Sequence, residues 1–143
     1  MPMKQAMPAP TAQACPCGRS GASKKPLTFA ACCGPYLGDF AARPAPDAES
    51  LMRSRYSAFV LGRSDYLLAT WHTSHRPSEL VLEPGVKWLG LAVRQHVLLD
   101  ESHAEVEFVA RQRERNGRAV RLHERSRFVR EDGRWYYVDG DQF

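Results

Sequence analysis

The sequence predicts an α+β protein in which a small cysteine-bearing module precedes a domain of helices packed on one curved antiparallel sheet. Two observations support this fold class. Helical periodicity comes first, between residues 47 and 71, and strand patterns separated by turn signals follow from residue 86 onward. All four cysteines and eight of the ten prolines lie before residue 47. The 143 residues, 43% of them apolar and 25% charged, suffice for one compact domain with a small appendage.

Composition divides the chain into three parts. Residues 1–14 are predicted to be a disordered lead, because they show no periodicity and too little apolar surface to offset the entropy of ordering. Residues 15–40 are the cysteine module, and residues 47–143 are the second domain. Pro44 and Pro46, which lie between the two, indicate a stiff linker.

The four cysteines predict a metal site. Fourteen residues separate the pair Cys15 and Cys17 from the pair Cys32 and Cys33. In a segment with almost no core, and with no apolar secretion signal at the start of the chain, four close thiols favour a metal over disulfides. Zinc accepts four tetrahedral thiolates, and its binding free energy can replace a hydrophobic core. We therefore expect one structural Zn²⁺ per chain; the alternative is four incidental or buried thiols.

The charge distribution bears on partners and location. The net charge of +4 belongs entirely to residues 1–46, since residues 47–143 hold 15 cations and 15 acids. Arg19, Lys24 and Lys25 would partly offset the negative charge of a zinc tetrathiolate, which weakens any case for nucleic-acid binding. No stretch is long and apolar enough to span a membrane, and the first ten residues lack a signal-peptide core, so we expect a cytoplasmic protein without membrane contact.

Two helices are predicted at the start of the second domain. The first covers residues 47–61, with an aspartate positioned to cap it and Gly62 as its stop. At 100° per residue, Arg55 falls inside the apolar stripe of this helix, whereas Arg53 points away from it. A second, short helix is predicted to begin at residue 64 or 65 and to lead towards Trp71.

Four strands should form an antiparallel meander over Val86–Leu99, Ser102–Glu114, Arg118–Arg130 and Arg134–Val138. A three-residue loop with Gly117 in the left-handed conformation would make the middle hairpin pair residues whose numbers sum to 232. Glu105 would then oppose Arg127 and Glu107 would oppose Arg125 on one face. The other face would carry Ala104, Val106, Phe108, Ala110, Leu122, Glu124, Ser126 and Phe128.

This register places polar groups on the apolar face of the sheet. Glu124 and Ser126 point inward, and Arg55 is the charged residue on the helix stripe that covers this face. Because an unpaired buried carboxylate is costly, Glu124 must either pair with Arg55 or open onto a wet pocket. The first case is an internal salt bridge between helix and sheet. The second is a cavity with Glu124, Arg55 and His72 as its polar groups.

Two other candidate sites have weaker support. His72 and His75 could be metal ligands, but no neighbouring acid or cysteine in the sequence completes a set, which favours loop histidines. Acids alternate with the arginines of the predicted strands, which favours a solvated sheet face over a nucleic-acid interface. These arginines are Arg111, Arg113, Arg121, Arg125 and Arg127.

The cysteine module resembles the SEC-C motif, the zinc-binding tail element of the SecA translocation ATPase. The resemblance covers residues 15–21, the pair at 24–25 and residues 32–34, and it departs from the motif at Arg19 and in a longer middle loop. The continuation through residues 34–36, 51–59 and 66–72 resembles the bacterial YchJ-like family over nearly all of residues 15–140. That resemblance implies a zinc-binding first domain and a nuclear-transport-factor-two-like, or cystatin-like, cone. It implies no activity.

Two functions are compatible with these features. The first is a zinc-binding adaptor without catalytic activity, which presents a basic surface to a protein or ribosome-like partner; the SecA motif favours it. The alternative is a small-molecule-binding protein or an isomerase- or hydratase-like enzyme that uses the cone cavity around Glu124 and Arg55. Cone folds often pair through the outer face of the sheet, so a homodimer is also compatible with the sequence.

Overall fold

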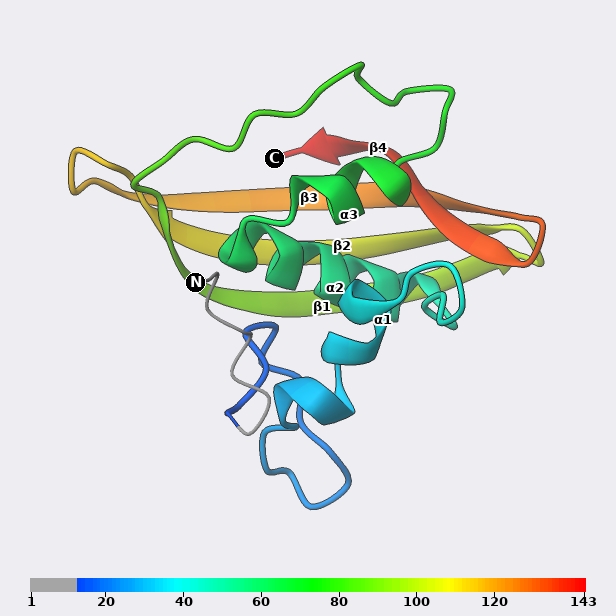
Figure 1. Cartoon of the computed structure of the whole chain (residues 1–143), viewed down its shortest axis with the longest axis horizontal. Coiled ribbons are helices and arrows are strands. Elements are labelled where there is room, and N and C mark those ends of the chain that lie inside the picture. Colours follow the sequence, from blue (N-terminus) through cyan, green and yellow to red (C-terminus); the bar gives the residue numbers. More distant parts are fainter. Residues whose placement is uncertain (1–12) are drawn as a thin grey trace, which may run out of the picture.

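The computed structural model describes residues 13–143, and residues 1–12 of the expected lead lie outside this part. Ala14, the last residue of that lead, pairs with Thr28 of the cysteine module. In Figure 1, helices α2 and α3 cross one face of a four-stranded sheet, and the cysteine module lies beside α2 and β1. The elements are η1 (Phe29–Ala31), α1 (Gly34–Gly38), α2 (Ala48–Leu61), α3 (Ser64–Ala69), β1 (Lys87–Asp100), β2 (His103–Arg113), β3 (Ala119–Glu131) and β4 (Arg134–Gln142).

Helix α2 begins and ends as its sequence predicts. The Asp47 carboxylate accepts a hydrogen bond from the Ser50 backbone N–H at 2.7 Å, and Gly62 ends the helix in the left-handed conformation at φ +72°. Arg55 is buried on this helix, as its position on the apolar stripe predicts. Arg53, which was predicted to point away from the apolar stripe, contacts the cysteine module.

The sheet is antiparallel, with the strand order β1-β2-β3-β4. The predicted register of the middle hairpin is confirmed: Glu105 pairs with Arg127, and Phe108 pairs with Glu124. Gly117 adopts φ +88° in the turn between β2 and β3, as the three-residue loop requires. Ala104, Val106 and Phe128 are consequently buried on the inner face of the sheet.

Strand β4 extends to Gln142, beyond the predicted end at Val138. A bulge interrupts the alternation of inward and outward side chains, and the pairing with β3 continues beyond it. The pairing shifts between Arg127 and Phe128, so that Asp139 faces the first and Tyr137 the second. Beyond the bulge, Asp139 and Asp141 both bind Arg127, with N···O distances of 2.6 and 2.8 Å. The guanidinium of Arg127 therefore forms its ion pairs with acids of β4, and not with Glu105, which lies opposite it in the β2–β3 register.

The cysteine module and the cone share one hydrophobic core. Cys15, Cys17 and Cys33 are buried in the same cluster as residues of α2 and of the sheet. The segment between the two parts is also tied down, because the Arg134 guanidinium donates to the backbone oxygens of Phe40 and Ala41. The module is thus packed as part of the domain.

The segment between α3 and β1 passes along the β4 edge of the sheet before it enters β1 (Figure 1). Its start is fixed by β4, since the His72 N–H donates to the Tyr137 oxygen at 2.7 Å and the Tyr137 N–H donates to the Thr70 oxygen at 2.8 Å. Among residues 13–143, the longest helix is α2, and no helix is long and apolar enough to cross a membrane.

Candidate functional site

The four cysteine sulfurs lie together at the base of the cysteine module. All four Sγ atoms are within 4.8 Å of one another, with 3.6 Å between Cys17 and Cys32 and 3.9 Å between Cys32 and Cys33. A tetrahedral ion bound at a zinc–thiolate distance of about 2.3 Å would separate its sulfur ligands by about 3.8 Å. The cysteines predicted as ligands therefore have the geometry of a four-coordinate metal centre.

Short backbone contacts shape the two loops that carry these thiols. The Cys15 N–H donates to the Leu27 oxygen at 2.9 Å, which closes the hairpin between the two cysteine pairs. Gly18 follows the first pair with φ +77°, a conformation that a side chain would strain. Gly34 follows the second pair, and a Cβ atom there would lie 2.8 Å from the Phe29 backbone oxygen.

Four thiols this close cannot all lose their protons without a cation between them. Hydrogen bonds from Cys17 and Cys33 lower the pKa of the Cys15 thiol, because they stabilise its thiolate. The hydrogen bond to Cys15 raises the pKa of Cys33 and of Cys17, because each keeps its proton to donate. A bound cation would take the place of these shared protons, which is the chemistry of a thiolate metal centre.

Polar contacts with α2 anchor the centre to the cone. The Cys15 sulfur lies 3.6 Å from the Ser57 hydroxyl, and the Arg53 guanidinium donates to the Cys17 backbone oxygen at 3.1 Å. Arg53 also binds Glu49 at 2.9 Å, so one side chain connects the centre with two turns of the helix. Three of the four thiols are buried by this packing, and only Cys32 is partly exposed.

A second site lies between α2 and the sheet, where a cavity of about 180 Å³ occupies the interior of the cone. Most of its wall is aromatic or aliphatic, and Arg55 and Glu124 contribute its charges. His123 also borders it, but the imidazole turns to the other face of the sheet and binds Glu107 at 2.8 Å. The remaining wall consists of Met52, Tyr56, Phe59, Trp71, Trp88, Phe108, Ala110, Leu122, Ser126, Tyr137 and Gln142.

Two hydroxyl groups hold the Glu124 carboxylate at this wall. Oε2 accepts hydrogen bonds from the Ser126 hydroxyl at 2.6 Å and from the Tyr137 hydroxyl at 3.1 Å. The partner of Oε1 among the described residues is the Gln142 amide, at a long 3.4 Å. Burial and the negative charge of Glu124 raise the pKa of the Tyr137 phenol, which therefore stays a donor. Gly140 leaves room for the carboxylate, because a Cβ atom there would lie 2.7 Å from the Glu124 carboxyl carbon.

Arg55 does not form a salt bridge with Glu124, which was the first of the two alternatives expected from the sequence. No ion pair within 4.0 Å joins these two residues, and Nη1 of Arg55 donates instead to the Leu67 oxygen and the Thr70 hydroxyl, both at 2.7 Å. The guanidinium carbon lies 4.6 Å from the ring centre of Tyr137 and 5.3 Å from that of Trp71. Burial lowers the pKa of Arg55 to about 10, so the side chain remains a cation at neutral pH.

His72, the third residue expected in the cavity, is not among its lining residues. Its Nε2 lies 2.8 Å from Glu131 and its Nδ1 lies 2.8 Å from the Ser74 hydroxyl, so the ring joins its loop to the end of β3. His75 likewise approaches Asp139, at 3.7 Å. Acids are therefore close to both histidines, contrary to the expectation from the sequence. Within residues 13–143, however, the cysteines alone form a group of three or more side chains with metal-ligand spacing.

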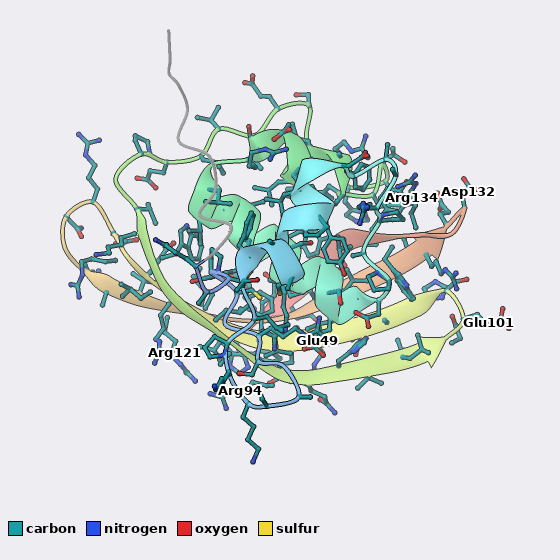
Figure 2. The ribbon with its side chains drawn as sticks, turned by 60° about the horizontal axis from the view of Figure 1, so that its bottom comes forward. Glu49, Arg94, Glu101, Arg121, Asp132 and Arg134 are labelled. Atoms are coloured by element: carbon teal, nitrogen blue, oxygen red, sulfur yellow. The ribbon has the colours of Figure 1, made fainter. Side chains whose placement is uncertain are left out.

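The outer face of the sheet carries paired charges. Arg125 binds Glu107 at 3.0 Å, in agreement with their predicted pairing. Arg94 and Arg121 project from the sheet on the side away from α2 (Figure 2). These charges support a solvated surface, and the absence of nucleic-acid binding stays a prediction.

Sequence reasoning missed three contributors to the cavity. Tyr137 lies within the predicted strand Arg134–Val138 and was given no role in the site, and Gln142 lay beyond the predicted end of that strand. Trp71 was expected only at the end of the short helix. The acidic stretch that follows Tyr137 could have indicated that the strand continues beyond this residue. The hydrogen bond of Tyr137 to Glu124, however, depends on the bulge between β3 and β4.

Comparison with known proteins adds a family to this geometry. Residues 47–140, which form the cone, match the family described as "YchJ, middle NTF2-like domain". The chain belongs to the YchJ-like family. It is similar to a UPF0225 protein of Polaromonas sp. (strain JS666), with 74% identity over 127 residues that cover 89% of this chain and 91% of the relative. A UPF0225 protein of Chromobacterium violaceum is 56% identical, covering 89% and 91% of the two chains.

Two solved structures share both parts of the molecule. One is the solution structure of a SEC-C motif containing protein from Rhodopseudomonas palustris, with a TM-score of 0.76, 33% identity, and coverage of 91% of this chain and 98% of the other. The second is the crystal structure of a SEC-C motif containing protein from Psychrobacter arcticus, with a TM-score of 0.75, 33% identity, and coverage of 90% and 82%. The predicted family and the predicted α+β fold are thus confirmed.

Proposed function

We propose that this protein binds a small molecule in the cone cavity and that its cysteine module holds a structural Zn²⁺. One observation carries the proposal: the cavity contains a carboxylate, Glu124, that is held in place by two hydroxyl groups but has no cationic partner among the described residues. A few fixed polar groups on the wall of a largely apolar cavity are typical of a ligand site.

The unfilled space supports a functional role. Protein interiors are normally packed as tightly as organic crystals, whereas about 180 Å³ stays unfilled here, in a cavity that is partly open to solvent. Apolar side chains of its wall are therefore left in contact with water when no ligand is bound. Ala110 lies on the wall where a larger apolar side chain could fill the space. Selection for stability alone would favour such a filled cone.

The closed ligand set supports a structural zinc. Four thiolates complete a tetrahedral shell and leave no position for water, so hydrolytic chemistry at the metal is not expected. The donor set also fits zinc better than a hard cation, which would prefer oxygen ligands. The contacts of Cys15 and Cys17 with α2 indicate what the metal would stabilise, namely the helix that covers the cavity.

A cavity-filling variant tests the ligand site. Fragments that bind the wild-type protein, detected by ligand-observed NMR, should no longer bind Ala110→Phe, because the new ring occupies the cavity. The control is Ala92→Phe, which places the same ring on the exposed outer face of β1 and should retain binding. Circular dichroism verifies that both variants are folded. If the fragments bind Ala110→Phe as well as the wild type, the cavity is not the ligand site.

Metal analysis tests the zinc proposal separately. Protein purified without added metal should contain one zinc per chain, and Cys17→Ser should lose it. Ser23→Ala is a matched control in the same module, since its side chain is exposed and lies outside the cysteine cluster. Full zinc content in Cys17→Ser, or much less than one zinc in the wild type, would overturn this part of the proposal.

The adaptor role expected from the sequence has less support and stays a prediction. Arg19 faces α2, where it donates to the Ser50 hydroxyl at 2.9 Å, so the basic surface that remains consists of the exposed Lys24 and Lys25. If these lysines recruit a partner, Lys24→Glu/Lys25→Glu should abolish its capture. The cytoplasmic location and a homodimer formed through the outer sheet also stay predictions.

A further inference from the structure

Two opposite charges face one cavity without touching each other. Arg55 is 5% exposed and Glu124 is partly buried, and both line the same 180 Å³ space. Charges in such surroundings attract strongly, since the effective dielectric constant is lower than that of water. They nevertheless form no ion pair within 4.0 Å.

Each charge is held apart by its own neighbours. Nη1 of Arg55 is engaged by the Leu67 oxygen and the Thr70 hydroxyl, while its guanidinium lies over the rings of Trp71 and Tyr137. Nε and Nη2 of Arg55 have no hydrogen-bond partner among residues 13–143, and neither is a fully enclosed atom. The guanidinium therefore has donors that a molecule in the cavity can reach.

The carboxylate is restrained in the same way. Ser126 and Tyr137 occupy Oε2 of Glu124, and Gly140 removes the side chain that would displace the carboxyl group. Oε1 keeps acceptor capacity, because its contact with Gln142 is 3.4 Å long. The cavity consequently offers fixed N–H donors from Arg55 and a fixed acceptor from Glu124.

Charge balance and size restrict what can occupy this space. One cation and one anion cancel, so a charged ligand would lose its hydration without a net opposite charge to replace it. An apolar cavity of roughly 150 Å³ accommodates benzene, which makes 180 Å³ suitable for one substituted ring. The aromatic wall around Trp88 and Phe59 favours a flat ligand that can pack against rings.

We propose that the cavity binds an uncharged, planar molecule that carries a hydrogen-bond acceptor and a donor on one group, as a primary amide or a lactam does. Its carbonyl oxygen accepts from Arg55, and its N–H donates to Oε1 of Glu124. This inference rests on the proposed ligand-binding function of the cavity and narrows it to one chemical class.

Four probes of nearly equal size test the class. Benzamide carries both an acceptor and a donor, benzoate is an anion with acceptors only, benzylamine is a cation with donors only, and toluene has neither. Their affinities for the full chain, measured by NMR titration, should rank benzamide first, by on the order of tenfold over each of the other three.

Two substitutions should shift this preference in opposite directions. Glu124→Gln leaves Arg55 as the unbalanced charge, so benzoate should gain affinity and overtake benzamide. Arg55→Met leaves Glu124 unbalanced, so benzylamine should gain instead. A purely structural role for either residue would weaken all four probes equally. Because Arg55 is buried and its loss can prevent folding, the Glu124→Gln result decides the matter by itself.

The outcomes separate this inference from the proposal on which it rests. If toluene or one of the charged probes binds best to the wild type, or if Glu124→Gln leaves the ranking unchanged, the cavity binds ligands but the amide class is wrong. If no probe binds and the fragment screen also finds nothing that Ala110→Phe excludes, the ligand-binding function itself fails. A benzamide preference that Glu124→Gln converts into a benzoate preference supports both.

Discussion

The substitution Gly140→Ala probes the placement of the Glu124 carboxylate. A Cβ atom at residue 140 would lie 2.7 Å from Cδ and 2.9 Å from Cγ of Glu124, whereas carbon atoms in contact prefer about 3.5–4.0 Å. The carboxylate must therefore move by about 1 Å, and its bonds to Ser126 and Tyr137 weaken or break. Hydrogen bonds to charged groups contribute about 1.5–3 kcal/mol each, so we expect a loss of about 2–4 kcal/mol.

Thermal unfolding followed by circular dichroism measures this loss, which corresponds to a decrease in Tm of about 6–16 °C for a chain of this length. Gly38→Ala is the matched control, because a Cβ atom at residue 38 meets nothing within 4 Å. The decisive comparison repeats Gly140→Ala in a Glu124→Ala background, where the displaced group is absent and the cost should largely vanish. If Gly140→Ala costs as much in that background, or nothing in the wild type, the carboxylate is not held where we place it.

Three further perturbations have expected results. Removal of the metal by a chelator should lower Tm by on the order of 10 °C, because the cysteine module shares its core with α2, and addition of zinc should restore it. An unchanged melting curve would contradict a structural metal. Arg53→Met should cost about 1–2 kcal/mol in urea unfolding, because it removes the bonds to Glu49 and Cys17, and a loss confined to zinc affinity without any change in stability would refute that coupling. Burial raises the pKa of Tyr66 to about 12, so the stability that this residue contributes is complete below about pH 10 and is lost as the pH rises towards 12. Tyr66→Phe should reduce this loss of stability at alkaline pH. An identical loss in the variant would contradict the role of Tyr66.

Local patterns were sufficient to predict the parts of the fold that depend on neighbouring residues. The cap at Asp47, the stop at Gly62 and the turn at Gly117 each rest on backbone chemistry that acts within a few residues. The register of the β2–β3 hairpin followed from its loop length and from face parity, and this register placed Glu124 on the inner face.

The contacts of the buried charges could not be predicted in this way. Arg55 and Glu124 were correctly expected on facing elements, but their separation depends on Thr70 and on Tyr137, which reach them from the end of α3 and from β4. The acidic and glycine-containing run at 139–141 resembles a turn in sequence, although a bulge at residue 138 lets it continue the strand. Long-range pairing of this kind has no local signature.

The docking of the cysteine module was likewise hidden from the sequence. Two prolines indicated a linker between separate modules, whereas the segment is held by Arg134, a residue 94 positions from its partner Phe40. Arg53 was expected to point away from the apolar stripe, and its actual partner, the Cys17 backbone oxygen, belongs to the other module. These contacts connect the metal centre to the wall of the cavity through α2.

The indole N–H signals of the three tryptophans give the most direct test of the central claim, which is that the cone cavity binds a ligand. Trp71 and Trp88 line the cavity, whereas Trp135 is buried in the same core but does not line it. In a ¹⁵N-correlated NMR titration with benzamide, or with any fragment from the screen, we predict that the signals of Trp71 and Trp88 move while that of Trp135 stays in place. Movement of Trp135 alone, or saturable binding that leaves both cavity tryptophans unchanged, would contradict the account.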